Sequence, residues 1–94
     1  MLKAETIDPY KRKSKISCSE CFLSYSARDY KILYENEKLA FFKFKLPSDK
    51  RKKIYCNNCL YESIEAFMGE KPGKMKLYLV GIDGNEVIVT FHKE

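Results

Sequence analysis

Two pairs of closely spaced cysteines constrain this chain more than any other feature of its sequence. The pairs are Cys18-Ser19-Glu20-Cys21 and Cys56-Asn57-Asn58-Cys59, and together they contain all four cysteines. A spacing of two intervening residues places both sulfur atoms on one side of a tight turn, and four such thiolates form a closed, structural zinc site. Iron also accepts four thiolates, but zinc is the more common occupant. The sequence therefore predicts Zn²⁺ bound by Cys18, Cys21, Cys56 and Cys59.

Paired cysteines have two other common uses. In a secreted protein they would form disulfides, but the chain opens with Met1-Leu2-Lys3-Ala4-Glu5 and lacks the apolar segment of a signal peptide. In a dithiol oxidoreductase one pair would act at the start of a helix, and the second pair would have no role. We therefore expect reduced thiols and an intracellular, cytoplasmic location.

The chain is short enough for a bound metal to matter to its stability. A domain of 94 residues buries only about 60–65% of the surface that its unfolded chain exposes. Because 45% of the residues are hydrophobic, we expect a globular rather than a disordered chain. Residues 1–15, with Pro9 and a basic cluster at 11–15, are expected to form a flexible basic segment. Residues 16–94 then form a single zinc-binding domain.

An alternating pattern predicts a β-hairpin over residues 30–46. Tyr30, Ile32 and Tyr34 fall at every second position, which is the period of a strand with one buried face. A polar stretch follows at 35–38, and it suits a reversal of the chain. The second strand would carry one apolar face and two lysines on the other: Ala40, Phe42, Phe44 and Leu46 opposite Lys43 and Lys45.

A helix and a second hairpin are predicted after the second cysteine pair. The helix over residues 57–68 has one apolar stripe, with Asn57 or Asn58 expected to cap its start and Gly69 to end it. The members of the stripe are Leu60, Ile64, Phe67 and Met68. The hairpin over 74–92 is predicted because Asp83-Gly84-Asn85 suits a tight turn between two apolar runs. Since both faces of these runs are apolar, we expect cover on each side, or pairing of an edge with another chain.

A cysteine knuckle, a β-hairpin and a second knuckle that opens a helix resemble, in this order, the treble-clef zinc finger. The resemblance covers residues 16–69 and implies a small α+β domain stabilised by zinc, followed by the C-terminal hairpin. A zinc ribbon is the alternative, but it has no helix after its second knuckle. Treble clefs bind DNA, RNA, ribosomes or proteins, so the resemblance implies no particular partner. The ββα metal nucleases, which resemble treble clefs, need a histidine on the hairpin, whereas this chain has only His92.

Basic residues concentrate just before the second cysteine pair. Residues 38–53 contain seven lysines and arginines but only one acidic residue, Asp49. Such a surface can bind phosphates with an affinity that depends on salt, and the alternative is a solvated loop that keeps the domain soluble. The predicted nucleic-acid-binding residues are Lys43, Lys45, Lys50, Arg51, Lys52 and Lys53, together with Lys11, Arg12 and Lys13.

No phosphate-binding loop, nucleophile motif or carboxylate pair in the sequence points to an enzyme. The sequence favours a non-enzymatic zinc module that associates with nucleic acid or the transcription machinery, with no membrane and no small-molecule substrate. The alternative is a protein adaptor or inhibitor that binds its partner through the 74–92 hairpin or the acidic face of the helix. Tyr30, Tyr34 and Phe41 would stack on bases if exposed, but aromatic residues beside a zinc site are more often part of the core.

Overall fold

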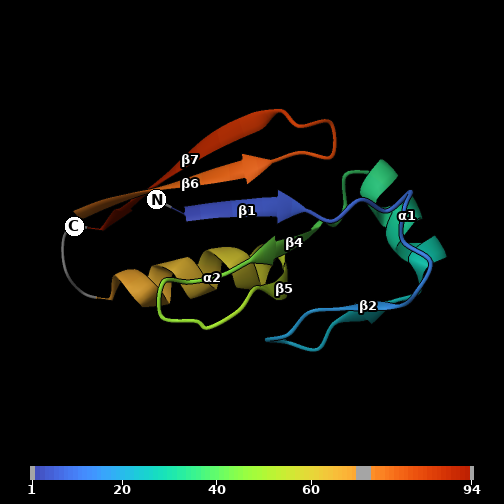
Figure 1. Cartoon of the computed structure of the whole chain (residues 1–94), viewed down its shortest axis with the longest axis horizontal. Coiled ribbons are helices and arrows are strands. Elements are labelled where there is room, and N and C mark those ends of the chain that lie inside the picture. Colours follow the sequence, from blue (N-terminus) through green and yellow to red (C-terminus); the bar gives the residue numbers. More distant parts are fainter. Residues whose placement is uncertain (1, 70–72, 94) are drawn as a thin grey trace.

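The computed structural model describes residues 2–69 and 73–93. A five-stranded sheet, two helices and a two-stranded ribbon make up this described part of the chain (Figure 1). In chain order the elements are β1 (Leu2–Thr6), β2 (Ile16–Ser17), β3 (Ser24–Tyr25), α1 (Ala27–Glu35), β4 (Phe41–Phe44), β5 (Lys53–Cys56), α2 (Asn57–Met68), β6 (Gly73–Val80) and β7 (Glu86–Lys93). Within the described ranges, neither helix has the length and apolar character that crossing a bilayer requires.

The N-terminal strand lies at the centre of the sheet, whose order is β5-β4-β1-β6-β7. β1 pairs in parallel with β6 and antiparallel with β4. This position differs from the flexible segment that was predicted over residues 1–15. The alternation of Leu2 and Ala4 with Lys3 and Glu5 is too short to indicate a strand by itself. Pairing on both edges, with strands far along the chain, stabilises it instead.

The hydrophobic core lies between the sheet and α2. Leu2 and Ala4 of β1 point toward the helix and are at most 4% exposed. The helix contributes Leu60 and Ile64, both 0% exposed, and it contacts β4 and β5. The other buried side chains on this face of the sheet are Phe42, Phe44, Tyr55 and Leu77. One apolar stripe of a helix thus covers one face of a sheet, which is how small α+β domains bury their core.

The opposite face of the sheet is covered only at one end, by α1 and β3. Phe41 points to this face, and its ring lies edge-on to Tyr30 of α1 and Tyr25 of β3, with centroids 5.2 and 6.5 Å away. The Tyr30 hydroxyl donates a hydrogen bond to the carbonyl of Ile7 at 2.7 Å and accepts one from the Phe41 N–H at 3.2 Å. Tyr30 therefore joins α1 to both β4 and the segment that follows β1.

The hairpin predicted over residues 30–46 is wrong, because its first half is the helix α1. Ser26 caps this helix, and its hydroxyl accepts a hydrogen bond from a backbone N–H of the first turn at 3.1 Å. Tyr30 and Tyr34 lie one turn apart, with ring centroids separated by 6.1 Å. Ile32 lies between them and is 48% exposed, so the apparent alternation arose from helical spacing. The hairpin of this region instead joins β4 to β5.

The predicted helix over residues 57–68 is confirmed as α2. It ends at Gly69, which has a φ of 64°, a conformation that glycine adopts without steric cost. Its N-cap is Cys56 and no side chain caps it, so the predicted capping by Asn57 or Asn58 is wrong.

The predicted C-terminal hairpin is confirmed as β6 and β7, which pair over eight residues each. The Asn85 N–H donates to the Asp83 carboxylate at 3.0 Å and stabilises the turn. The expectation that the hairpin is covered on each side is wrong, because consecutive residues of β7, which point to opposite faces, are exposed. β7 is also an edge strand of the sheet. Val87 and Ile88 are 61% and 55% exposed.

Candidate metal centre

The first cysteine pair lies at the tip of the ribbon that β2 and β3 form. The N–H of Phe22 donates to the Cys18 carbonyl at 3.0 Å, and the N–H of Cys18 donates to the Leu23 carbonyl at 2.8 Å. Phe22 closes this turn with a φ of 63°, and its ring is 78% exposed. Cys18 is buried, whereas Cys21 is exposed.

The second cysteine pair lies where β5 passes directly into α2. Cys56 is the last residue of β5 and the N-cap of the helix, and Cys59 belongs to the first helical turn. Both side chains are at most 8% exposed. The N-terminal end of a helix favours a negative charge, but burial raises the pKa of both the Cys56 and the Cys59 thiol.

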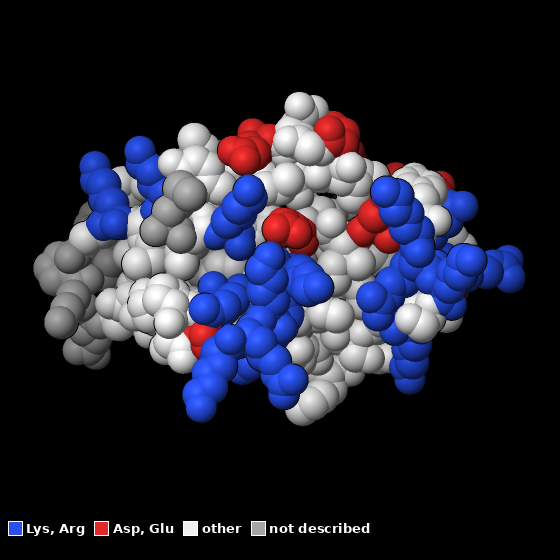
Figure 2. Space-filling model, viewed as in Figure 1, with Lys and Arg blue, Asp and Glu red and all other residues white. Residues whose placement is uncertain are grey.

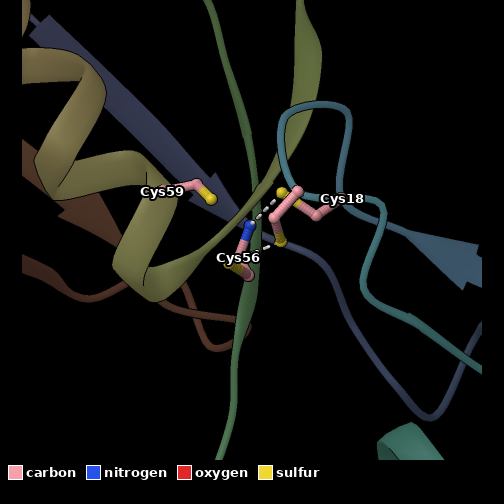
Figure 3. Close-up of side chains that lie close together, drawn as sticks. Cys18, Cys56 and Cys59 are labelled. Atoms are coloured by element: carbon pink, nitrogen blue, oxygen red, sulfur yellow. Dashed lines mark hydrogen bonds between the residues drawn. The ribbon is translucent and has the colours of Figure 1, made fainter.

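Backbone hydrogen bonds hold the first pair against the second. The Ser19 N–H donates to the Ile54 carbonyl at 2.7 Å, and the Ile54 N–H donates to the Ser19 hydroxyl at 3.3 Å. The Cys56 N–H donates to the sulfur of Cys18 at 3.4 Å. Figure 3 shows Cys59 extending from α2 toward the side chains of Cys18 and Cys56. Segments far apart in the sequence thus present their thiols to one point.

The spacing of the four sulfur atoms fits a single tetrahedral metal ion. All four lie within 4.8 Å of one another, and those of Cys21 and Cys56 are 3.8 Å apart. Four metal–sulfur bonds of about 2.3 Å place the sulfurs of a tetrahedron about 3.8 Å apart. A disulfide requires about 2.05 Å, and all four thiols are free. The cysteine cluster is therefore compatible with metal binding, and the structure contains neither of the disulfides that the alternative would require.

The protonation of the thiols also favours a bound cation. Burial acts to raise the pKa of Cys18, but hydrogen bonds from the backbone of Cys21, Cys56 and Glu20 lower it to about 7. Burial, together with the neighbouring thiols, raises the pKa of Cys59. One thiolate forms readily in this cluster, whereas further negative charges repel it unless a cation is shared. Metal binding supplies that cation and releases the remaining protons.

The ligand set limits what such a centre can do chemically. Four protein sulfurs complete a tetrahedral coordination and leave no position for water or substrate. His92 lies on β7, and among the described residues it does not belong to the group of ligand atoms that cluster. The arrangement therefore suits a centre that stabilises the fold.

The predicted nucleic-acid-binding residues fall into two groups on the surface. Figure 2 shows basic side chains gathered over the β4–β5 connection and, separately, over the α1 end of the molecule. The first group contains Lys43, Lys45, Lys50, Arg51, Lys52 and Lys53, and the second contains Lys11, Arg12 and Lys13. The structure thus does not bring the N-terminal cluster together with residues 43–53.

Two lysines of the first group form ion pairs. Lys52 lies 3.3 Å from Glu5, and Lys53 lies 3.8 Å from Asp49. The other four are exposed and form no ion pair with a carboxylate of residues 2–69 or 73–93; they are Lys43, Lys45, Lys50 and Arg51. Their charges remain available to an anion in solution.

The three aromatic residues considered for base stacking, Tyr30, Tyr34 and Phe41, belong to the core or pack against it. Tyr30 and Phe41 are 0% exposed and Tyr34 is half-buried, so the interpretation as packing residues is the better one.

Sequence reasoning missed three exposed lysines on the sheet, Lys3, Lys74 and Lys76. Each lies beside apolar residues in its strand, but the two strands, β1 and β6, are far apart in the sequence and give no continuous basic signal.

No family model matches this chain, and comparisons with curated proteins and with solved structures found no significant similarity. The cysteine geometry and the surface chemistry are therefore the grounds on which a function is proposed.

Proposed function

We propose that this chain is a non-enzymatic zinc-binding module of the treble-clef type. Its support is the order of a cysteine knuckle, the β4–β5 hairpin and a helix whose start carries the second cysteine pair. The hairpin lies at residues 41–56 rather than 30–46. Zn²⁺ is the proposed metal because four mostly buried thiolates in a closed tetrahedron are the usual structural zinc site. Cys18, Cys21, Cys56 and Cys59 would hold it.

We infer that the module associates with nucleic acid, in an accessory role to transcription, through the surface of β4 and the β4–β5 connection. The observation that carries this proposal is the concentration of unpaired cations there, from Lys43 to Arg51. Cations held on a rigid hairpin bind a phosphate backbone by releasing its counterions, with little sequence preference. The closed metal centre leaves no position for substrate, which is consistent with a binding protein.

A salt titration with charge-reversed variants tests this proposal. The zinc-loaded chain should bind a fluorescent oligonucleotide at about 50 mM salt and lose at least about a hundredfold in affinity by about 200 mM, if several phosphates are contacted. The double variant Lys50→Glu/Arg51→Glu should bind at least about tenfold more weakly. Arg28→Glu/Lys31→Glu, both on α1, is the matched control, because it changes the charge equally at the far end. Equal loss in both variants would place the binding surface elsewhere.

A protein adaptor is the second candidate, and one observation favours it. β7 is an edge strand with two exposed apolar side chains, Val87 and Ile88, and such an edge can pair with a strand of another protein. The adaptor would be supported if the chain captures one discrete protein partner and this capture persists after nuclease treatment. Val87→Lys should then abolish the capture.

A further inference from the structure

The sheet face opposite α2, here called the open face, carries lysines from three neighbouring strands. Side chains alternate between the two faces of a strand, so the residues between buried positions point to the open face. The exposed lysines on it are Lys3 of β1, Lys43 of β4 with Lys45 just beyond it, and Lys74 and Lys76 of β6. Only Lys43 and Lys45 belong to the basic segment that the sequence indicated.

Strand pairing places these lysines beside one another. β1 lies between β4 and β6, with Glu5 opposite Lys43 and Lys3 opposite Tyr78. Adjacent strands lie about 4.8 Å apart, and alternate residues along one strand lie about 7 Å apart. Figure 2 shows basic side chains over this part of the molecule, next to those of the β4–β5 connection. The open face thus brings together lysines of three strands, with the carboxylate of Glu5 beside Lys43.

Two shallow depressions follow these lysines where β1 begins. One, of about 350 Å³, has Lys3, Lys45 and Lys52 among its lining residues. The other, of about 420 Å³, is lined by Lys74, Lys76 and Tyr78 together with apolar side chains. Both depressions share Leu2 and Pro47, so they form neighbouring parts of one concave surface.

Few acidic groups oppose these charges. Glu5 is the carboxylate nearest the centre of this group of lysines, and Lys52 forms an ion pair with it at 3.3 Å. Glu86 lies at the other end of β7, opposite Val80 and beside the turn. The lysines at the start of β6 are therefore left without a described carboxylate partner, and an anion can take that place.

We propose that the open face binds single-stranded nucleic acid, with its lysines on the phosphodiester backbone and Tyr78 stacked against a base. This inference rests on the proposed association with nucleic acid and names the form of the ligand and a second set of residues. A single strand suits the geometry because its unpaired bases can turn toward the exposed surface of a sheet. A duplex does not, because its major groove, about 12 Å wide, admits a helix or a two-stranded ribbon.

Tyr78 is the aromatic side chain that supplies the stacking surface. It is half-buried on β6, opposite Lys3 and opposite Ile88 of β7. Lys3, opposite it on β1, and Lys76, two residues before it on β6, can hold the backbone while its ring contacts a base. Stacking of this kind tolerates any base, because every base has a π-face.

Binding of the zinc-loaded full chain to a fluorescent oligo-dT strand, and to a duplex of equal length, tests the proposal. Wild type should bind the single strand at least about tenfold more tightly than the duplex. Lys74→Gln/Lys76→Gln should lose at least about tenfold in affinity at about 50 mM salt and about 1.4 from the slope of log affinity against log salt, since each phosphate contact on a single strand contributes about 0.7. The matched control, Arg28→Gln/Lys31→Gln on α1, should stay within about twofold.

Tyr78 variants separate stacking from charge. Tyr78→Leu should weaken single-strand binding at least about fivefold, whereas Tyr78→Phe keeps the ring and should remain within about twofold. Retained zinc and an unchanged unfolding temperature in both Tyr78→Leu and Tyr78→Phe keep this comparison independent of folding. Equal binding by the leucine variant would overturn the stacking role.

The outcomes distinguish the two proposals. If wild type binds no oligonucleotide, the proposed function and the open-face site both fail. If Lys50→Gln/Arg51→Gln weakens binding while Lys74→Gln/Lys76→Gln does not, the proposed function stands and the open face is wrong. Equal affinity for phosphatidylserine vesicles, or for the duplex, would also overturn the single-strand assignment.

Discussion

The region around the cysteine cluster and the C-terminal hairpin are built in different ways. The ribbon that carries the first cysteine pair has strands of only two residues each, and its hydrogen bonds to β5 connect distant parts of the chain. β6 and β7 instead pair over eight residues around one tight turn. We therefore expect the first region to depend on the proposed metal, whereas β6 and β7 are held by pairing with each other and with β1.

Metal removal should break this comparison most strongly. Binding of a structural zinc contributes on the order of 10 kcal/mol in small zinc domains, which is as large as the whole stability of a typical domain. We expect a chelator to remove amide protection first at residues 16–25 and 53–60, while β6 and β7 lose less. Hydrogen exchange followed by mass spectrometry measures both regions together. Unchanged protection around the cysteines would contradict the comparison.

The core beneath the metal centre should show the next largest effect. Leu60→Ala removes a side chain that is 0% exposed, and such truncations cost about 2–5 kcal/mol of unfolding free energy. Phe67→Ala on the same helix is the control, because Phe67 is 40% exposed and should lose less than half as much. Urea denaturation of the zinc-loaded proteins measures both. If Phe67→Ala lowered the free energy of unfolding as much as Leu60→Ala, the apolar stripe of α2 would pack differently from the arrangement described here.

Alkaline pH should weaken the β5 side of the molecule. Burial, followed by the charge of Asp49, raises the pKa of Tyr55 to about 12, from about 10 in an unfolded chain. Because the pKa is raised on folding, the folded state favours the neutral hydroxyl of Tyr55. This contribution to the free energy of unfolding is fully present below about pH 10 and is lost as the pH rises toward 12. The loss is on the order of 2–3 kcal/mol, because each unit corresponds to about 1.4 kcal/mol.

Denaturation curves between about pH 9 and 12 measure the effect of Tyr55, with Tyr55→Phe as the reference. The phenylalanine variant removes the titrating hydroxyl, so its stability should fall less steeply over this range. Parallel curves for the two proteins would show that the Tyr55 hydroxyl does not contribute.

The smallest expected effect is a gain in stability at the first cysteine pair. Phe22 has a φ of 63°, a region that costs most residues about 1 kcal/mol or more but costs glycine nothing. Because glycine also loses more entropy on folding, Phe22→Gly should raise the free energy of unfolding by up to about 1 kcal/mol. Val87→Thr on the hairpin, at a 61% exposed position, should change it by less than about 0.5 kcal/mol. A destabilised Phe22→Gly would show that the exposed ring packs in solution.

The parts of the fold that could be predicted from the sequence are those whose determinants are local. α2 has a full apolar stripe and a glycine at its end, and the C-terminal hairpin has its turn residues between two long apolar runs. α1 could not be predicted from alternation, because Tyr30 is buried by partners on β4 and after β1. The cap at Ser26 was the available signal for a helix. β1 forms because strands remote in the sequence pair with both of its edges.

The candidate metal centre shows the same division. The spacing of the cysteines indicated which side chains would cluster, since a turn with two thiols is a local feature. The way in which the two cysteine pairs meet depends on the hydrogen bonds of Ser19 with Ile54, and no sequence pattern predicts these bonds. The open face was missed because its lysines come from β1, β4 and β6, and only the sheet places them together.

X-ray absorption spectroscopy of the purified chain at the zinc edge tests the central claim most directly. We predict one zinc ion per chain with four sulfur neighbours at about 2.3 Å, and the loss of one sulfur neighbour in the variant Cys59→Ser. A chain that retains no metal, or a zinc ion surrounded by nitrogen and oxygen atoms, would contradict the tetrathiolate centre.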